Sequence, residues 1–454
     1  MSGRALKGIR GPLLTFKADP FVSDNREECY DYISDGLVVT DSDRIVAVGD
    51  YSQISGRYPD LCDIDCYGRD SLILPGFIDS HVHYVQSPMI GSFGDTLLNW
   101  LNQYTFPTES KFKDKEFADT VARMFFRQLL ENGTTTANVF STTFATSVDA
   151  FFEESERYNT RMISGKVLQD RNVPPSLADN SAEESVELSE RLLEKWHRRG
   201  RQLYAVIPRF APTSTPRQLE LAGDLYQRHI GDGVYMHTHL DEAEDEIAWV
   251  RSLFPEALNY ADVYARFGLV GRRSVMAHCC VVEEDEWLVL SRNECGVVTC
   301  PSSNLFLGDA LFKFWEAKNP ERPCRTGVGS DVGAGTSFSI PRQLGEAYKV
   351  GMLRMRPLDS LSSFYMATRG GAEALHLEDT IGSLSPGYEA DITVIDLAPN
   401  EFMRWRMQYT DNIAEKLFVL QTVAPDNMCL ATYVAGKKVY DRMRPVPYMY
   451  AKDV

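Results

Sequence analysis

Short apolar runs alternate with longer amphipathic segments through the middle of the chain. Eight runs have the length and the β-branched content of buried strands: residues 72–83, 134–140, 162–169, 203–210, 234–240, 274–280, 296–300 and 327–331. Between them, apolar residues recur at helical spacing, and five such segments are clear: residues 114–133, 181–199, 215–229, 244–254 and 340–353. The pattern therefore predicts strands and helices in alternation.

This alternation predicts an α/β protein in which eight parallel strands close into a (β/α)8 TIM barrel with the helices outside. The strand count alone leaves a doubly wound parallel sheet open. The two ends of the chain differ, with short β-rich runs at residues 30–40, 44–50, 390–396 and 429–441. We expect these runs to form a small composite β-sandwich domain of residues 1–74 and 389–454, beside a barrel domain of residues 75–388.

Composition narrows the class of partner. The chain has 454 residues and a net charge of −17, from 64 acidic and 47 basic residues, with no dense basic cluster. Such a chain repels a phosphate backbone, so we expect no nucleic-acid partner. No stretch approaches the roughly 18 apolar residues that span a bilayer, and the first residues lack the apolar core of a signal peptide, so we expect no membrane association. The nine cysteines form no Cys-x-x-Cys pair, which predicts reduced, mostly buried thiols in a cytoplasmic protein.

The histidines are unevenly placed. There are eight, and five of them lie at the ends of three predicted strands: His81, His83, His237, His239 and His278. Residues i and i+2 of a strand point to the same face, so His81 and His83 present two imidazoles side by side. One such pair is common, and a lone histidine on an apolar strand is more often a hydrogen-bonded core residue. Five at three strand ends, with Gly-Ser-Asp at 329–331 ending a fourth, favour a metal site at the mouth of a barrel.

The other histidines have simpler interpretations. His197 and His229 lie at the ends of predicted helices, where a histidine interacts with the helix dipole or lies on the surface. His376 is expected to be helical and structural.

Four stretches resemble the amidohydrolase superfamily: PGFIDSHVH (75–83), the histidine ending the fifth predicted strand, MAH (276–278) and GSD (329–331). The segment IGSLSPGYEADITVID (381–396) resembles the return of such chains into their β-sandwich. The resemblance implies a metal-dependent hydrolase of C–N bonds, built as a barrel beside a small sandwich.

Further stretches are similar to the purine-deaminating members of this superfamily. They are LLNWLNQYTFPTE (97–109), ENGTTT (131–136), PRF (208–210), HLDE (239–242), VMAHC (275–279), CPSSNL (300–305) and GSDVGAG (329–335). The resemblance implies deamination of guanine to xanthine and ammonia, and a homodimer. Related deaminases acting on 8-oxoguanine, another purine or a triazine stay open, as does an inactive scaffold of the same fold, which would be expected to have lost ligands.

The resemblance also assigns the metal site. It implies one zinc ion per subunit, held by His81, His83, His239 and Asp331. It selects His239 over His237, which then lies one layer deeper as a packed, hydrogen-bonded residue. Members with two metals add a carboxylated lysine, but the fourth predicted strand has none and Lys166, on the third, is interpreted as structural.

Three residues are expected to act on the substrate. Asp331 takes a proton from the attacking water and passes it to the leaving amine, and Glu242 moves a proton to the ring nitrogen N3. The alternative for Glu242 is a helix-dipole role, since acidic residues gather in first turns. His278 is expected to orient the water or the intermediate rather than to bind the metal.

Three more residues are expected to bind the base. The amide of Gln86 can donate and accept, Arg209 donates only and so selects a carbonyl oxygen such as guanine O6, and Phe210 offers a ring for stacking. The alternatives are a salt bridge for Arg209 and a core position for Phe210. The aromatic-rich segment 405–420 and PVPYMY (445–450) are candidates for a dimer interface or for packing on the barrel.

Overall fold

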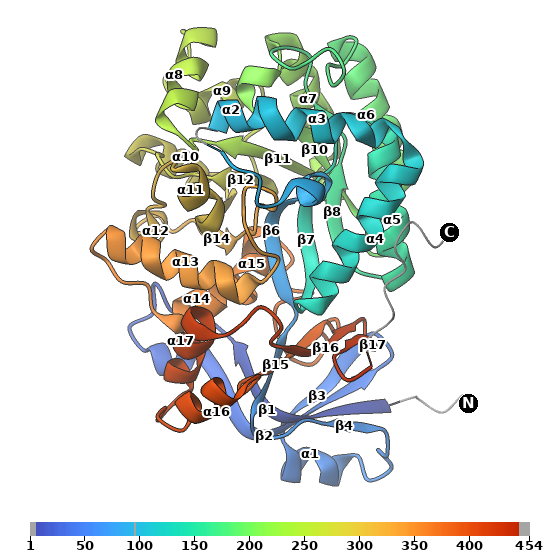
Figure 1. The fold of residues 1–454 in the computed structure, drawn as a ribbon, viewed down its shortest axis with the longest axis vertical. Coiled ribbons are helices and arrows are strands. Elements are labelled where there is room, and N and C mark those ends of the chain that lie inside the picture. The colour runs from blue at the N-terminus through green and yellow to red at the C-terminus, as the bar shows by residue number, and fades with distance from the viewer. Residues whose placement is uncertain (1–5, 95–96, 445–454) are drawn as a thin grey trace.

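The structure is a computed structural model that describes residues 6–94 and 97–444. It contains two sheets, a parallel barrel and, below it in Figure 1, a sheet that joins the two ends of the chain. PVPYMY at 445–450 lies outside the described residues. Within the described part of the chain, no helix combines the length and the apolar character needed to cross a membrane.

The parallel sheet is the predicted barrel. Its strands are β6 (Phe77–His83), β7 (Thr134–Phe140), β8 (Arg161–Gly165), β9 (Val167–Leu168), β10 (Leu203–Pro208), β11 (Tyr235–Leu240), β12 (Ser274–His278), β13 (Gly296–Thr299) and β14 (Arg325–Val328). Neighbours follow chain order from β6 to β14, with β9 beside β10. The first and last strands meet where Asp331 N donates to His81 O at 3.0 Å and His83 N donates to Val332 O at 3.2 Å. The (β/α)8 barrel is confirmed, and the doubly wound sheet is excluded.

Helices cover the outside of the barrel (Figure 1). The helices are α1 (Tyr51–Arg57), α2 (Leu97–Trp100), α3 (Phe106–Glu109), α4 (Lys115–Glu131), α5 (Ala145–Tyr158), α6 (Ala182–Trp196), α7 (Pro216–His229), α8 (Glu244–Leu253), α9 (Tyr260–Arg266), α10 (Glu284–Arg292), α11 (Pro301–Leu307), α12 (Phe314–Ala317), α13 (Ile340–Leu353), α14 (Ser360–Met366), α15 (Arg369–Ala374), α16 (Glu401–Met407) and α17 (Ile413–Val423). The five predicted amphipathic segments are α4, α6, α7, α8 and α13. Three of them begin at a capping side chain, such as Asp114, which accepts from Glu116 N at the start of α4.

The second sheet is assembled from both ends of the chain. Its strands are β1 (Leu6–Phe16), β2 (Tyr30–Asp41), β3 (Arg44–Asp50), β4 (Ile64–Cys66), β5 (Ser71–Pro75), β15 (Ile392–Asp396), β16 (Cys429–Val434) and β17 (Lys437–Asp441). The two ends join where β5 pairs antiparallel with β15. The separate, largely antiparallel sheet is therefore confirmed, while the domain boundaries at 74 and 389 stay a prediction.

One expected strand is divided. Residues 72–83 form two strands in different sheets, β5 and β6, with Gly76 between them. A Cβ at Gly76 would lie 2.1 Å from the Thr135 hydroxyl oxygen. Only glycine therefore allows the chain to pass from one sheet to the other so close to β7.

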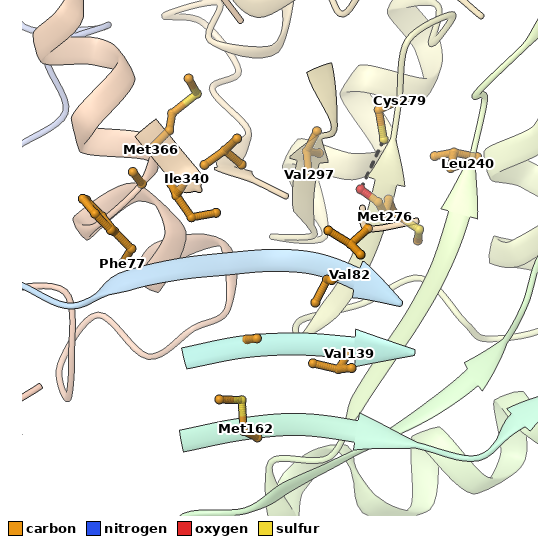
Figure 2. Packing of buried hydrophobic residues seen from close by; sticks show 14 of the residues in the cluster. Phe77, Val82, Val139, Met162, Leu240, Met276, Cys279, Val297, Ile340 and Met366 are labelled. Carbon is orange, nitrogen blue, oxygen red and sulfur yellow. Dashed lines mark hydrogen bonds between the residues drawn. The ribbon is translucent and has the colours of Figure 1, made fainter. Parts of the chain in front are cut away.

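Side chains along the barrel strands alternate between two hydrophobic clusters, one outside the sheet and one inside the barrel. Figure 2 shows Val82, Val139 and Met162, from three adjacent strands, within the large cluster that also contains helix residues such as Ile340. Phe140, next to Val139, belongs to a different cluster. Because successive side chains point to opposite faces of a strand, an outward Val82 places its two neighbours in the barrel interior.

The base of the barrel contacts the small sheet through buried charges. Arg161, at the start of β8, donates from Nε to Glu389 at 2.8 Å, and Arg201 donates to both Glu389 and Asp391, at 2.5 and 3.1 Å. Although burial raises it, the pKa of Glu389 is lowered below its ordinary value by the two arginines. Each buried charge here has an opposite partner.

Candidate active site

The predicted residues converge at the mouth of the barrel. His81 and His83 end β6, His239 lies near the end of β11, and His278 ends β12. Asp331 follows β14. Catalytic residues at the carboxyl ends of strands are the usual arrangement in this fold.

Three imidazoles and one carboxylate face a common point. Nε2 of His81 lies 3.2 Å from Asp331 Oδ1, and Nε2 of His83 lies 3.4 Å from the same oxygen. Nε2 of His83 and Nε2 of His239 lie 3.2 Å apart. The ligand atoms of the three histidines all lie within 4.8 Å of one another, which is the spacing expected around one ion.

The donor set fits a zinc ion. His81 Nε2 is buried and faces Asp331 Oδ1, but it makes no hydrogen bond to any of the described residues. Burial lowers the pKa of His81 to about 3 and holds the pKa values of His83 and His239 well below the ordinary value. The rings are therefore neutral and can offer lone pairs, and three imidazoles with one carboxylate are ligands that zinc prefers.

Two of the three rings, those of His81 and His239, are oriented through their second nitrogen. His81 Nδ1 lies 2.8 Å from His237 Nε2, and His239 Nδ1 lies 2.6 Å from the carbonyl oxygen of Arg209. An Nδ1–H that donates to these acceptors leaves Nε2 free to bind a metal. His237 lies deeper in the barrel, and its Nδ1 has no partner among the described residues.

The backbone around Asp331 is unusual. Asp331 has a φ of 47° and His278 a φ of 70°, both in the left-handed region that favours glycine. Asp79 on β6 accepts from Ser330 N at 2.9 Å and also from the Ser330 hydroxyl. This anchor fixes the turn that carries Asp331.

A second cluster faces the candidate metal-binding group, which consists of His81, His83, His239 and Asp331. His278 Nδ1 lies 3.4 Å from Glu242 Oε1, and His278 Nε2 lies 3.8 Å from Asp331 Oδ2. Asn304 Nδ2 lies 3.0 Å from His278 Nδ1. Burial and the nearby Asp309 carboxylate raise the pKa of Glu242 well above its ordinary value. A carboxyl group that is protonated more readily than usual can act as an acid near neutral pH.

A pocket lies above these groups. It is lined by His83, Gln86, Trp100, Leu101, Arg209, Phe210, His239, Glu242, His278, Leu307, Asp331 and Ala334. All three residues expected to bind the base are among them, and the Phe210 ring lies edge-on to Trp249 at 5.9 Å. Polar groups thus converge at one end of a pocket with apolar walls, as in many sites for small molecules.

Several residues that line the pocket or lie behind it are not singled out by the sequence. Trp100 and Leu101 add apolar walls, and buried Glu109 hydrogen-bonds to Gln86 and Arg209. Asn304 contacts His278, and Asp309 contacts Glu242. All of these residues except Asp309 lie in the stretches 97–109 and 300–305, although neither stretch shows a period that singles out one residue.

Three other expectations concern residues away from the pocket. Lys166 Nζ is buried against Asp179 at 2.6 Å, away from the metal-binding group. The prediction that His376 is helical is wrong, because α15 ends at Ala374 and His376 has a φ of 51°. All nine cysteines are unpaired, and all but Cys62 and Cys66 are buried.

The chain is similar to known proteins along most of its length. The sequence profile of the amidohydrolase family matches residues 72–439. Guanine deaminase of Escherichia coli K12 is 43% identical over 97% of this chain and 100% of its own length. The solved structure of E. coli guanine deaminase superposes with a TM-score of 0.92 at 42% identity, over 96% of this chain and 100% of that one. Guanine deaminase from Bradyrhizobium japonicum also gives 0.92, at 33% identity, over 96% and 99%.

Proposed function

The chain belongs to the amidohydrolase family, and we propose that it is a guanine deaminase, which hydrolyses guanine to xanthine and ammonia in purine catabolism or salvage. One observation carries this function. In a chain similar along nearly its whole length to guanine deaminases, three of the four proposed metal ligands and Glu242 line the same pocket as Gln86 and Arg209.

One zinc ion per subunit completes the proposed site. The residues that would hold it are His81, His83, His239 and Asp331. When bound, zinc supplies a Lewis acid that lowers the pKa of a water molecule to about 7. The absence of a lysine on β10 supports a single ion over a pair.

The chain's own groups then move the protons. Asp331, whose Oδ1 faces the imidazoles and whose Oδ2 faces His278, accepts the proton of the attacking water and delivers it to the leaving amine. Glu242 donates a proton to N3 as the bond to C2 forms, which prevents negative charge from accumulating on the ring. His278, held by Asn304, orients the water between these two carboxyl groups.

The base is held by three residues. Arg209 donates to guanine O6, the Gln86 amide binds the polar edge of the ring, and Phe210 covers its face. The same catalytic groups would serve a related deaminase, so the substrate depends on Arg209 and Gln86. An inactive scaffold is disfavoured because the chain retains every residue expected to bind the metal.

We also propose a cytoplasmic homodimer. The free cysteines suit a reducing compartment. On and just after α16, Phe402, Trp405 and Tyr409 expose 55%, 52% and 63% of their surface, while Met403 is buried against the protein. One face of this segment packs on its own chain, and the aromatic face is available to a second copy. Light scattering of the wild type and of Trp405→Glu tests this, with a dimer and a monomer expected.

The test of function is ammonia release by the zinc-loaded protein from guanine, 8-oxoguanine, adenine and cytosine. Turnover of guanine that is abolished in Glu242→Ala is the expected result. Glu244→Ala removes an exposed carboxylate from the same acidic run and is the matched control. Preference for another base would overturn the roles of Gln86 and Arg209, and a protein that binds no zinc would favour the scaffold.

A further inference from the structure

Glu109 lies behind the proposed base-binding residues. It is the last residue of α3 and only 1% of its surface is exposed. Its Oε1 accepts from Gln86 Nε2 at 3.0 Å, and its Oε2 accepts from Arg209 at 2.7 Å. One carboxylate therefore binds both polar groups that face the base.

This contact determines which way each partner can point. An ionised carboxylate only accepts hydrogen bonds, so the Gln86 amide must turn its nitrogen toward Glu109. The carbonyl oxygen of Gln86 is then free to accept a hydrogen bond from a ligand in the pocket. Arg209 uses one terminal nitrogen for Glu109, and its guanidinium lies 5.6 Å from the Phe106 ring centroid. The remaining N–H groups of the fork are fixed in direction.

We propose that Glu109 is a positioning residue that determines the specificity of the base pocket. By holding a carbonyl acceptor on Gln86 beside donors on Arg209, it makes the pocket complementary to a ring lactam. This inference rests on the proposed function. It extends that function from guanine to the chemical feature that is recognised, an N–H next to a carbonyl.

A pocket built in this way disfavours purines that carry an amino group at C6. A purine with an amino group at C6 offers donors where guanine has O6, and a bare ring nitrogen where guanine has N1–H. Donors would then face Arg209, and the Gln86 carbonyl would lose its partner. Sites that hydrogen-bond a substrate group can reject an analogue lacking it by roughly 10⁴-fold.

The position of Glu109 distinguishes it from an ion pair that only stabilises the fold. Gln86 and Arg209 line the pocket, whereas Glu109 lies behind them. Within residues 6–94 and 97–444, no other group hydrogen-bonds to the Gln86 amide nitrogen or to the Arg209 guanidinium. In Glu109→Gln the new side chain both donates and accepts hydrogen bonds, so the amide of Gln86 can turn either its nitrogen or its oxygen toward residue 109.

The test compares guanine with 2,6-diaminopurine, which has the same 2-amino group but an amino group at C6. Ammonia release gives kcat/KM for both bases in the wild type and in Glu109→Gln. We expect the ratio in favour of guanine to fall at least tenfold in the variant. The loss should come mainly from a higher KM for guanine, because Glu242 and Asp331 are untouched.

Glu389→Gln is the matched control. It neutralises another buried carboxylate bound by arginines, far from the pocket, at the base of the barrel. Its ratio should equal that of the wild type even if the protein is less stable. If Glu109→Gln fails to fold, Gln86→Met keeps the pair between Glu109 and Arg209 and should also lower the ratio about tenfold.

The outcomes separate the two proposals. A wild type that deaminates guanine, with an unchanged ratio in Glu109→Gln, overturns the role of Glu109 alone. An unchanged ratio in Gln86→Met overturns the roles of both Gln86 and Glu109. An equal fall of the ratio in Glu389→Gln also overturns it, since the effect is then one of stability. A wild type that prefers 2,6-diaminopurine overturns both the proposed function and the lactam rule.

Discussion

The mouth and the base of the barrel use the same kinds of buried residue in opposite ways. At the base, Glu389 and Asp391 are bound by two arginines, and the pKa of Glu389 lies below its ordinary value. At the mouth, the pKa of Glu242 is raised by burial, and His81 Nε2 makes no hydrogen bond within the described part of the chain. Paired charges stabilise the fold, whereas groups left without partners are available to a metal and a substrate.

Removing the metal should have the largest effect, confined to the mouth. Chelation should reduce ammonia release to background, and zinc should restore it. The melting temperature should fall as well, because a ligand present at 100 times its Kd stabilises a fold by about 2.7 kcal/mol. Magnesium should not restore activity, since it prefers oxygen ligands. Full activity in protein shown to be metal-free would refute the assignment.

Glu242→Gln should have the next largest effect. Loss of a group that transfers a proton should lower kcat by about 10²–10⁴-fold. The free energy of unfolding should stay the same or rise, because the fold holds this carboxyl group at a raised pKa. Steady-state kinetics and urea unfolding measure both quantities. Glu244→Gln is the control, and a large loss of stability without loss of kcat would contradict the comparison.

Glu389→Gln should show the reverse. Removing the Glu389 charge should cost about 3 kcal/mol of unfolding free energy, because Arg161 loses its carboxylate and Arg201 keeps only Asp391. The kcat per folded molecule should not change, because Arg161 and Arg201 lie at the opposite end of the strands from the pocket. Urea denaturation followed by fluorescence measures the first quantity. A fall in kcat at a temperature where the variant is folded would argue against separate roles for the two ends.

The smallest expected effect is on stability at acidic pH. The folded-state pKa of Glu389 lies below its ordinary value of 4.5, so its ionised form stabilises the fold. That contribution is fully present above pH 4.5 and is lost as the pH falls through the folded pKa. Melting curves between pH 7 and 3 should therefore be less pH-dependent in Glu389→Gln below that point. Parallel curves for the two proteins would show that Glu389 does not contribute.

The sequence predicts the barrel well because its strands are buried on both faces and separated by amphipathic helices. The period of two along a strand is also enough to place His81 and His83 side by side on one face. Glu109 and Asp309 could not be found in this way. Each lies at the end of a short helix or in a loop, and its role depends on side chains distant in sequence, such as Arg209. The hydrophobic pattern also could not predict that residues 72–83 form two strands, because Pro75 and Gly76 divide the segment without making it less apolar.

The pairing of β5 with β15 has a consequence for biosynthesis. Residues 71–75 leave the ribosome long before residues 392–396 exist, on the order of 15–60 s at translation rates of about 5–20 residues per second. During that interval one edge of β5 has no neighbour, and an open edge can pair with another chain. A transcript truncated just before β15 would encode every residue of the catalytic pocket and still yield a chain prone to aggregation. A strand translated late therefore protects the edge of one translated early.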